Sequence, residues 1–157
     1  MANIKFTGID EYVEALQNLY GDVDKNIEAA VNAGADVVAD TVRVEINSIP
    51  EDNRNFVPRG EMRTGLKRIQ INGLKSSFGI TPLRNDGGFI NRKVGFDGYN
   101  KIGQPNSYIA RTIEKGTSWL RKYSFMSKAQ RASKALCEVK LRETLEASIY
   151  DSFQTKL

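Results

Sequence analysis

The sequence predicts an α+β fold, in which a small antiparallel sheet packs against a long helix in the N-terminal half and a long C-terminal helix. Apolar residues recur at helical spacing over residues 23–48 and again over 125–153. Short β-branched and aromatic runs, separated by Asn-Gly and Gly-Gly pairs, lie between the two helical patterns. With 157 residues, 40% of them hydrophobic, a single domain spanning 1–157 is expected.

The first 48 residues predict two helices. A short amphipathic helix covers residues 10–20, and Gly21 is expected to end it. Asp22 is a suitable N-cap for a longer helix from Val23 to Ser48. Pro50 terminates this helix, because proline cannot continue the backbone hydrogen bonds.

Three strands are expected in the middle of the chain. The first two, Leu66–Ile71 and Leu74–Thr81, flank Asn72-Gly73, which is a strong hairpin signal. The third, Phe89–Phe96, follows a turn at 86–88 and carries Arg92 on its otherwise apolar face. These strands predict a half-buried antiparallel sheet with helices on one side.

Two polar segments, 50–63 and 97–106, are predicted to be loops. The first contains two prolines and a glycine, and the second is rich in glycine and asparagine. Loops of this length are either functional or partly disordered, so we expect both to be mobile in the free protein.

Residues 108–117, Tyr-Ile-Ala-Arg-Thr-Ile-Glu-Lys-Gly-Thr, predict a short helix ending at Gly116. A carboxylate near a helix C-terminus is disfavoured by the helix dipole, so Glu114 should have a compensating partner. That partner is expected to be Arg111 or a basic group from residues 54–93, in a structural ion pair. General acid–base catalysis by Glu114 is the alternative, although no second titratable group stands out.

The C-terminal helix, about 125–153, has two apolar stripes on different faces. A single sheet cannot cover both stripes, so either the helix bends or the second stripe meets another partner. One stripe comprises Ala129, Ala132, Leu136 and Val139. The second is a possible subunit interface and comprises Leu141, Leu145, Ile149 and Phe153.

Charge is distributed unevenly along the chain. Residues 1–53 hold 3 basic and 11 acidic side chains, whereas residues 54–93 hold 9 basic and 2 acidic ones. The ends of the chain could therefore attract each other, within a subunit or between subunits. The run 119–129 is basic with interleaved aromatics, which suits either nucleic-acid binding or a helix entrance with Phe125 buried.

Several chemistries are excluded or weakened by composition. The chain has no histidine, which excludes a Ser-His-Asp triad, a Cys-His pair and a His-ligated metal. No glycine-rich phosphate-binding fingerprint is present. The single Cys137 cannot form an internal disulfide and is expected to be a packing residue. No cofactor or metal is expected, and no apolar run approaches the roughly 20 residues needed to cross a bilayer.

The order of these segments resembles the tail-completion, or head–tail joining, proteins of tailed bacteriophages, often labelled minor tail proteins. Phe-x-Gly-Ile-Asp-Glu-Tyr opens the chain at residues 6–12, and Lys-Val-Gly-Phe, with Gly95, follows at 93–96. The most specific element is Glu-x-Gly-Thr at Glu114, Gly116 and Thr117. The second is the Gly65-Leu66-Lys-Arg68 turn into a strand. The chain departs from the family pattern in having Lys115 between the acid and the glycine, and 122–125 in place of Arg-Pro-Phe.

The resemblance implies a structural virion protein without enzymatic activity, made in the host bacterial cytoplasm. Such a protein forms a ring, commonly sixfold, at the neck between the head connector and the tail tube or tail terminator proteins. DNA passes through the ring with only transient, non-specific contact, and no membrane is involved. The family-motif residues, Glu114 included, would then be structural. The alternative is a basic nucleic-acid-binding protein of a phage or bacterium.

Overall fold

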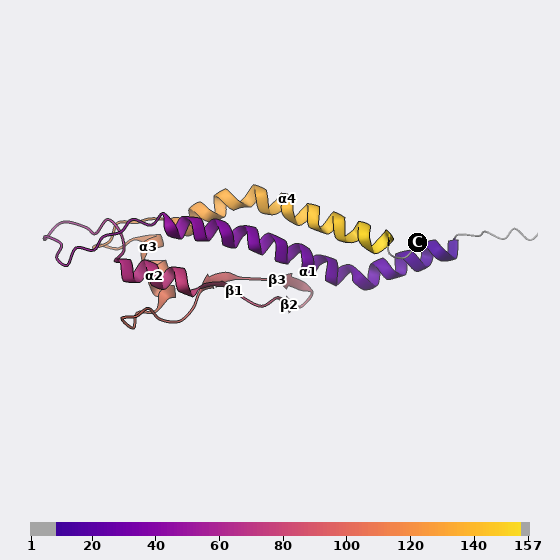
Figure 1. Cartoon of the computed structure of the whole chain (residues 1–157), viewed down its shortest axis with the longest axis horizontal. Coiled ribbons are helices and arrows are strands. Elements are labelled where there is room, and N and C mark those ends of the chain that lie inside the picture. The colour runs from indigo at the N-terminus through magenta and orange to yellow at the C-terminus, as the bar shows by residue number, and fades with distance from the viewer. Residues whose placement is uncertain (1–8, 155–157) are drawn as a thin grey trace, which may run out of the picture.

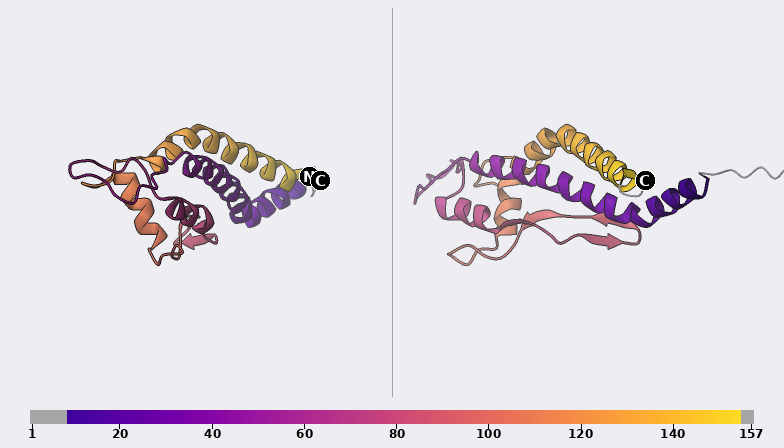
Figure 2. Two further views of the ribbon diagram at one scale, coloured as in Figure 1. Left: turned by 60° about the vertical axis from the view of Figure 1, so that its left-hand side comes forward. Right: turned by 45° about the vertical axis from the view of Figure 1, so that its right-hand side comes forward.

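The computed structural model describes the backbone of residues 9–154 and the side chains of 22–152 and 154. Two long helices, α1 (Ile9–Asn47) and α4 (Phe125–Gln154), lie side by side along most of their length (Figure 1). The short helices and a narrow hairpin lie on the other side of α1, as the two further views show (Figure 2). The predicted α+β class, with small antiparallel sheets and two long helices, is confirmed.

Helix α1 is continuous through Gly21, so the predicted break between two N-terminal helices is wrong. A single glycine costs about 1 kcal/mol inside a helix, which the good helix formers on both sides and the packing against α4 outweigh. Asp22 therefore lies within the helix, where it pairs with Lys25 at 3.3 Å, and does not cap it. The end of α1 before Pro50 agrees with the prediction.

Helix α2 (Arg68–Ser77) replaces the first predicted strand, the Asn72-Gly73 turn and the first half of the second predicted strand, whose remainder contains a strand at Phe78–Ile80. The backbone N–H of Lys67 donates to Gln70 Oε1 at 3.1 Å, which provides a partner at the helix start. Gly73 faces the beginning of α3 (Asn106–Lys115), where an added Cβ would lie 2.6 Å from Asn106 Oδ1. The glycine thus marks a close contact between helices, which overrides its turn propensity.

Residues 78–96 form one long hairpin rather than a strand within a wider sheet. Strand β1 (Phe78–Ile80) pairs with β4 (Val94–Phe96), and β2 (Arg84–Asp86) pairs with β3 (Phe89–Asn91). The register shifts by one residue between the two halves, because residues 81–83 on the first strand lie opposite only 92 and 93 on the second. Gly87 and Gly88, both with positive φ, make the turn as predicted.

Arg92 anchors the hairpin to α1. Its Nη1 donates to Asn32 Oδ1 at 2.9 Å, and its Nε donates to the Thr81 carbonyl at 2.9 Å, where the register shifts. A cation on the apolar face is therefore satisfied by partners from both the helix and the opposite strand.

The core lies at the end of the molecule where all four helices meet. Its largest side chains with under 2% exposure are contributed by every helix and by the link between α3 and α4. They are Val42, Ile46, Leu74, Asn106, Ile113, Leu120 and Phe125. Phe78 and Phe96 of the hairpin pack against this cluster, with the Phe96 ring 5.9 Å from that of Phe125.

The second apolar stripe predicted on the C-terminal helix begins against α1. Leu141 packs on Gly34 of α1, where an added Cβ would lie 2.9 Å from Leu141 Cγ. Leu145 and Ile149 follow at four-residue intervals and are half-buried, whereas the side chain of Phe153 is outside the described residues. Leu141, the first member of the second predicted stripe, therefore packs on α1, which favours burial of this stripe within the subunit over a spare surface.

The first predicted stripe is divided. Ala129 is buried in the core, but Ala132 is exposed, and Leu136 and Val139 are 60% and 49% exposed. The buried row instead continues through Ser133 and Cys137, whose thiol donates to the Gly34 carbonyl at 3.5 Å. Burial raises the pKa of this thiol, which agrees with its predicted role in packing.

Candidate functional site

Glu114 caps the N-terminus of α4. Its carboxylate accepts hydrogen bonds from the backbone N–H of Met126 at 2.9 Å, the N–H of Ser127 at 3.1 Å, and the Ser127 hydroxyl. The first N–H groups of a helix have no partner within the helix, and the helix dipole favours a negative charge there. Glu114, at the end of α3, therefore stabilises the beginning of α4.

The predicted ion pair of Glu114 is wrong. None of the salt bridges among the described residues involves Glu114 or Arg111. Residues 54–93 do not supply a partner either. The prediction was correct that a carboxylate at the C-terminal end of α3 requires compensation, but the positive end of another helix provides it.

Gly116 allows the chain to reverse direction between α3 and α4. Its φ of 74° and ψ of 169° lie in a region that is essentially restricted to glycine. An added Cβ would lie 3.0 Å from the backbone nitrogen of Lys122, so the two segments touch at this position. The predicted C-terminal glycine is confirmed, and its N–H donates to the Thr112 carbonyl at 2.8 Å.

Thr117 closes the turn that follows. Its Oγ1 accepts a hydrogen bond from the Leu120 N–H at 3.1 Å, and its own N–H donates to the Leu120 carbonyl at 2.9 Å. This brings Leu120 into the core with 0% exposure. Glu114, Gly116 and Thr117 therefore act together as a joint that fixes α4 relative to α3.

The second motif, Gly65-Leu66-Lys-Arg68, leads into helix α2 rather than into a strand. Gly65 lies against Pro50, which follows α1, since an added Cβ would come within 1.8 Å of the Pro50 carbonyl oxygen. Leu66 is buried, and its N–H donates to the same carbonyl at 2.9 Å. Arg68 is exposed and bonds Glu51 through Nε at 3.1 Å. Gly95, by contrast, has open space where a Cβ would stand.

Asp52, which no pattern in the sequence singles out, holds the base of the 50–63 loop. Its side chain is 2% exposed and pairs with Arg54, whose Nη2 lies 2.7 Å from Oδ2. The Thr64 N–H also donates to Oδ2 at 3.0 Å, and Arg63 Nη1 lies 3.8 Å from Oδ1. The Arg54 hydrogen bond, with those from the Thr64 and Arg54 N–H groups, holds the pKa of Asp52 well below its usual range. An acid two residues before an arginine in a polar loop is too common a pattern to have singled it out.

The loop base and the joint are connected. The Arg63 N–H donates to the Trp119 carbonyl and the Arg121 N–H donates to the Arg63 carbonyl, both at 2.8 Å. The basic run 119–129 thus serves as the entrance to α4, and the predicted burial of Phe125 is confirmed. The projecting loop is therefore fixed to the same joint that positions α4.

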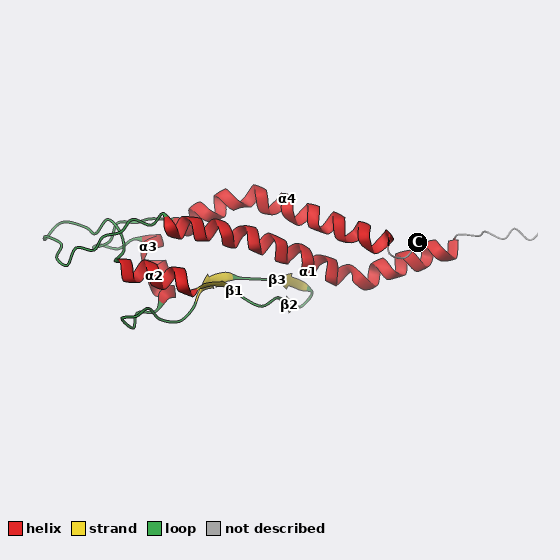
Figure 3. Cartoon of the chain, viewed as in Figure 1, coloured by secondary structure: helices red, strands yellow, loops and turns green. Residues whose placement is uncertain are grey.

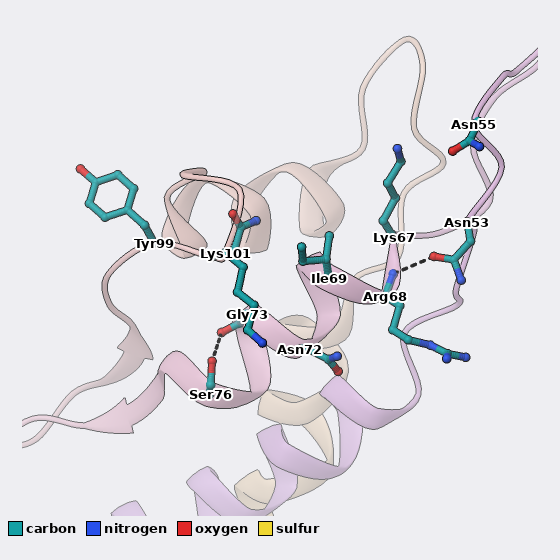
Figure 4. A pocket seen from close by; sticks show the side chains of 11 residues that line it. Asn53, Asn55, Lys67, Arg68, Ile69, Asn72, Gly73, Ser76, Tyr99 and Lys101 are labelled. Atoms are coloured by element: carbon teal, nitrogen blue, oxygen red, sulfur yellow. Dashed lines mark hydrogen bonds between the residues drawn. The ribbon is translucent and has the colours of Figure 1, made fainter.

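A basic cleft of about 660 Å³ lies between α2 and the two loops. Figure 4 shows that its side chains come from α2, from the segment after α1 and from the segment before α3, and that the Tyr99 ring points away from the others. Three cations and no acid are among the lining residues, so the cleft can accept an anionic group. The lining residues are Asn53, Asn55, Lys67, Arg68, Ile69, Asn72, Gly73, Ser76, Tyr99, Asn100 and Lys101.

Among residues 22–152 and 154, whose side chains the structure describes, no group of three or more His, Cys, Asp or Glu is placed to hold a metal ion. Over the same residues, no helix combines the length and the apolar character needed to cross a membrane. Glu114, the one acid considered for catalysis, has its carboxylate directed to the start of α4.

No protein-family model, curated protein or solved structure matches the chain.

Proposed function

We propose that the protein is a structural component of a tailed-phage virion, where it forms a ring at the head–tail junction. The ring connects the head connector to the tail tube and leaves a central passage for DNA. The proposal begins from the sequence resemblance described above. It is supported by the local roles of Glu114, Gly116 and Thr117, which position α4 relative to α3 through a helix cap and a turn.

The observation that carries the proposal is the placement of exposed aromatic side chains on projecting segments. Phe56 is 76% exposed on the 50–63 loop, and Phe89 is 78% exposed beside the hairpin turn. The loop and the β2–β3 turn lie at opposite ends of the layer formed by α2 and the hairpin (Figure 3). Two different apolar projections at opposite ends suit a subunit that contacts its two neighbours through different surfaces.

The fixed base of the loop adds to this support. Arg54, Arg63 and Thr64 all bond Asp52, so the loop projects from a rigid origin. A rigid base lowers the conformational entropy lost when the tip binds a neighbour. The loop is thus suited to reach another subunit without opening the core.

The test compares phage particles assembled with the wild-type protein and particles assembled with a variant of either projection. Phe56→Ser and Phe89→Ser should leave the monomer folded by circular dichroism, because both side chains are largely exposed. We expect each to reduce ring formation, measured by native mass spectrometry, and to leave separate heads and tails in electron micrographs. Val44→Ser is the matched control, since Val44 is also exposed, at 62%, but lies in the last turn of α1 and not on either projection. Intact particles with both tip variants would contradict the proposal.

The basic cleft favours a second candidate, a nucleic-acid-binding protein. Lys67, Arg68 and Lys101 could contact phosphates, and the 72% exposed Tyr99 could stack on a base. This candidate predicts tight, salt-dependent binding of duplex or single-stranded DNA by the isolated protein. It also predicts that Lys67→Ala with Lys101→Ala weakens binding and flattens its salt dependence. Binding that is weak at physiological salt would favour the ring, through which DNA must slide.

A further inference from the structure

The basic cleft between α2 and the two loops holds cations that its own surroundings do not neutralise. Lys67, Arg68 and Lys101 line it, and no acid does. Arg68 is engaged by Glu51, whose Oε1 lies 3.1 Å from the arginine Nε. Neither Lys67 nor Lys101 forms an ion pair with another residue in the described part of the chain. The cleft therefore presents two uncompensated ammonium groups to whatever enters it.

The segments that build the cleft have the same excess of positive charge. Residues 48–77 and 97–105 together hold seven basic and four acidic side chains. Three of the four acids, Glu51, Asp52 and Glu61, are already paired with arginines of the same segments. This end of the molecule therefore attracts anionic groups.

The opposite end of the molecule is acidic. Helix α1 begins there, and its first turns extend beyond the end of α4 in Figure 1 and in the right-hand view of Figure 2. Residues 9–24, the acidic start of α1, hold five acids and no base, with Lys5 and Lys25 on either side in the sequence. Lys25 is itself bonded to Asp22 at 3.3 Å.

The neighbouring elements do not neutralise this charge. Residues 143–154 of α4 hold three acids and no base, while Lys140 and Arg142 precede them and Lys156 follows in the sequence. Strand β2 of the nearby hairpin carries one residue of each sign. The acidic start of α1 is thus a projecting helix end of one sign.

We propose that the cleft of one subunit binds the acidic start of α1 of a second copy of the chain. The acids of the first turns, Asp10, Glu11 and Glu14, then lie beside Lys67 and Lys101. Charge complementarity selects this segment, because no other stretch of the same length in the chain holds as many acids without a base. Its place at a free helix end leaves it able to enter a cleft.

This contact cannot form within one subunit. Helix α1 is continuous from Ile9 to Asn47, so its ends are about 57 Å apart at about 1.5 Å per residue. Asn53 and Asn55, which line the cleft, follow the far end of the same helix. The contact therefore joins two copies through two different surfaces, which is the arrangement that closes a ring.

The inference rests on the proposed ring, because it names the parts of neighbouring subunits that meet. The loop that bears Phe56 also supplies Asn55 to the cleft, so both belong to one contact surface. Exposed ion pairs are individually weak and are screened by salt. The charges therefore orient the neighbours, and association should decrease as salt rises.

The experiment reverses the charge on each side of the contact. Lys67→Glu with Lys101→Glu makes the cleft acidic, and Glu11→Lys with Glu14→Lys makes the start of α1 basic. Self-association is measured by sedimentation velocity and light scattering over a concentration series at low and at high salt, with circular dichroism to confirm the fold.

The matched control is Asp36→Lys with Asp40→Lys. It makes the same change of charge at exposed positions of α1, but away from the first turns.

We expect the wild type and the control to associate at low salt. Either charge reversal alone should raise the concentration needed for association about tenfold or more, because like charges then meet. An equal mixture of the two variants should recover association, since each acidic cleft then meets a basic helix start and each basic cleft an acidic one. One chain carrying all four changes should recover it as well.

Three results would overturn the inference: a wild type that is monomeric at every concentration in low salt, single reversals that associate like the wild type, or a mixture that is not restored. A monomeric wild type that binds duplex DNA, with binding lost in the Lys67→Glu, Lys101→Glu variant, would assign the cleft to nucleic acid instead. Closed rings in particles made with either reversal alone would overturn this contact and leave the proposed function intact. Open chains of subunits without closed rings would support the contact and count against the ring.

Discussion

Replacing Glu114 by alanine should destabilise the protein by about 2–3 kcal/mol. The substitution leaves the N–H groups of Met126 and Ser127 and the Ser127 hydroxyl without their acceptor. Loss of a helix N-cap costs about 1 kcal/mol, and loss of a charge at the helix N-terminus a further 0.3–1 kcal/mol. The half-buried position adds a desolvation cost, since water replaces the carboxylate only in part.

Glutamine at position 114 keeps one acceptor oxygen but not the charge, so Glu114→Gln should cost about 1 kcal/mol. The free energies of unfolding should be measured in urea, with thermal midpoints as a second readout. For a chain of this size 1 kcal/mol corresponds to a shift of about 2–4 °C.

Arg111→Ala is the matched control because it removes the partner expected in an ion pair on the same helix. The capping role predicts a change within about 0.5 kcal/mol for this exposed residue. Equal losses for Arg111→Ala and Glu114→Ala would refute the capping role, as would an alanine variant at 114 as stable as the wild type.

Three further predictions concern the joint and the loops. Gly116→Ala should cost about 2–3 kcal/mol in urea unfolding, since its backbone conformation and the nearby Lys122 backbone both exclude a Cβ; an unchanged midpoint would show that the joint can relax. Because the folded-state pKa of Asp52 is lowered, its contribution to stability is present above the unfolded pKa and should be lost as the pH falls below about 4. Asp52→Asn should flatten that part of the pH–stability profile, and identical profiles for both proteins would contradict the assignment. Amide exchange should be fast within residues 51–62 and 97–106 except at the N–H groups bonded at the loop bases, and uniform protection across both segments would contradict the expected mobility.

The long helices were predictable because their apolar periodicity extends over many turns. Local signals misled where tertiary contacts decided the outcome. Gly21 looks like a helix end, yet one glycine is a small cost within a helix of 39 residues. Asn72-Gly73 looks like a hairpin turn, yet Gly73 is required where α2 meets Asn106. Neither the continuity of α1 through Gly21 nor the contact of Gly73 with Asn106 can be predicted from residues close in sequence.

The candidate site was predictable only in part. The spacing of Glu114 and Gly116 correctly located a helix end that needs compensation for its acid. The compensating groups are the backbone N–H groups of Met126 and Ser127. Almost every residue has such a group, so the residue types do not show which of them Glu114 binds. On α4 the first predicted stripe is only partly correct, because the buried row passes from Ala129 through Ser133 and Cys137, which an apolar count omits.

The most direct test of the proposed function is a cryo-electron microscopy map of the neck of virions that carry this protein. The account predicts a closed ring of copies of this chain between the head connector and the tail tube, with DNA or an open channel at its centre. The tips bearing Phe56 and Phe89 should contact neighbouring subunits in that map. A neck that lacks the chain, or that contains it without a closed ring, would contradict the account.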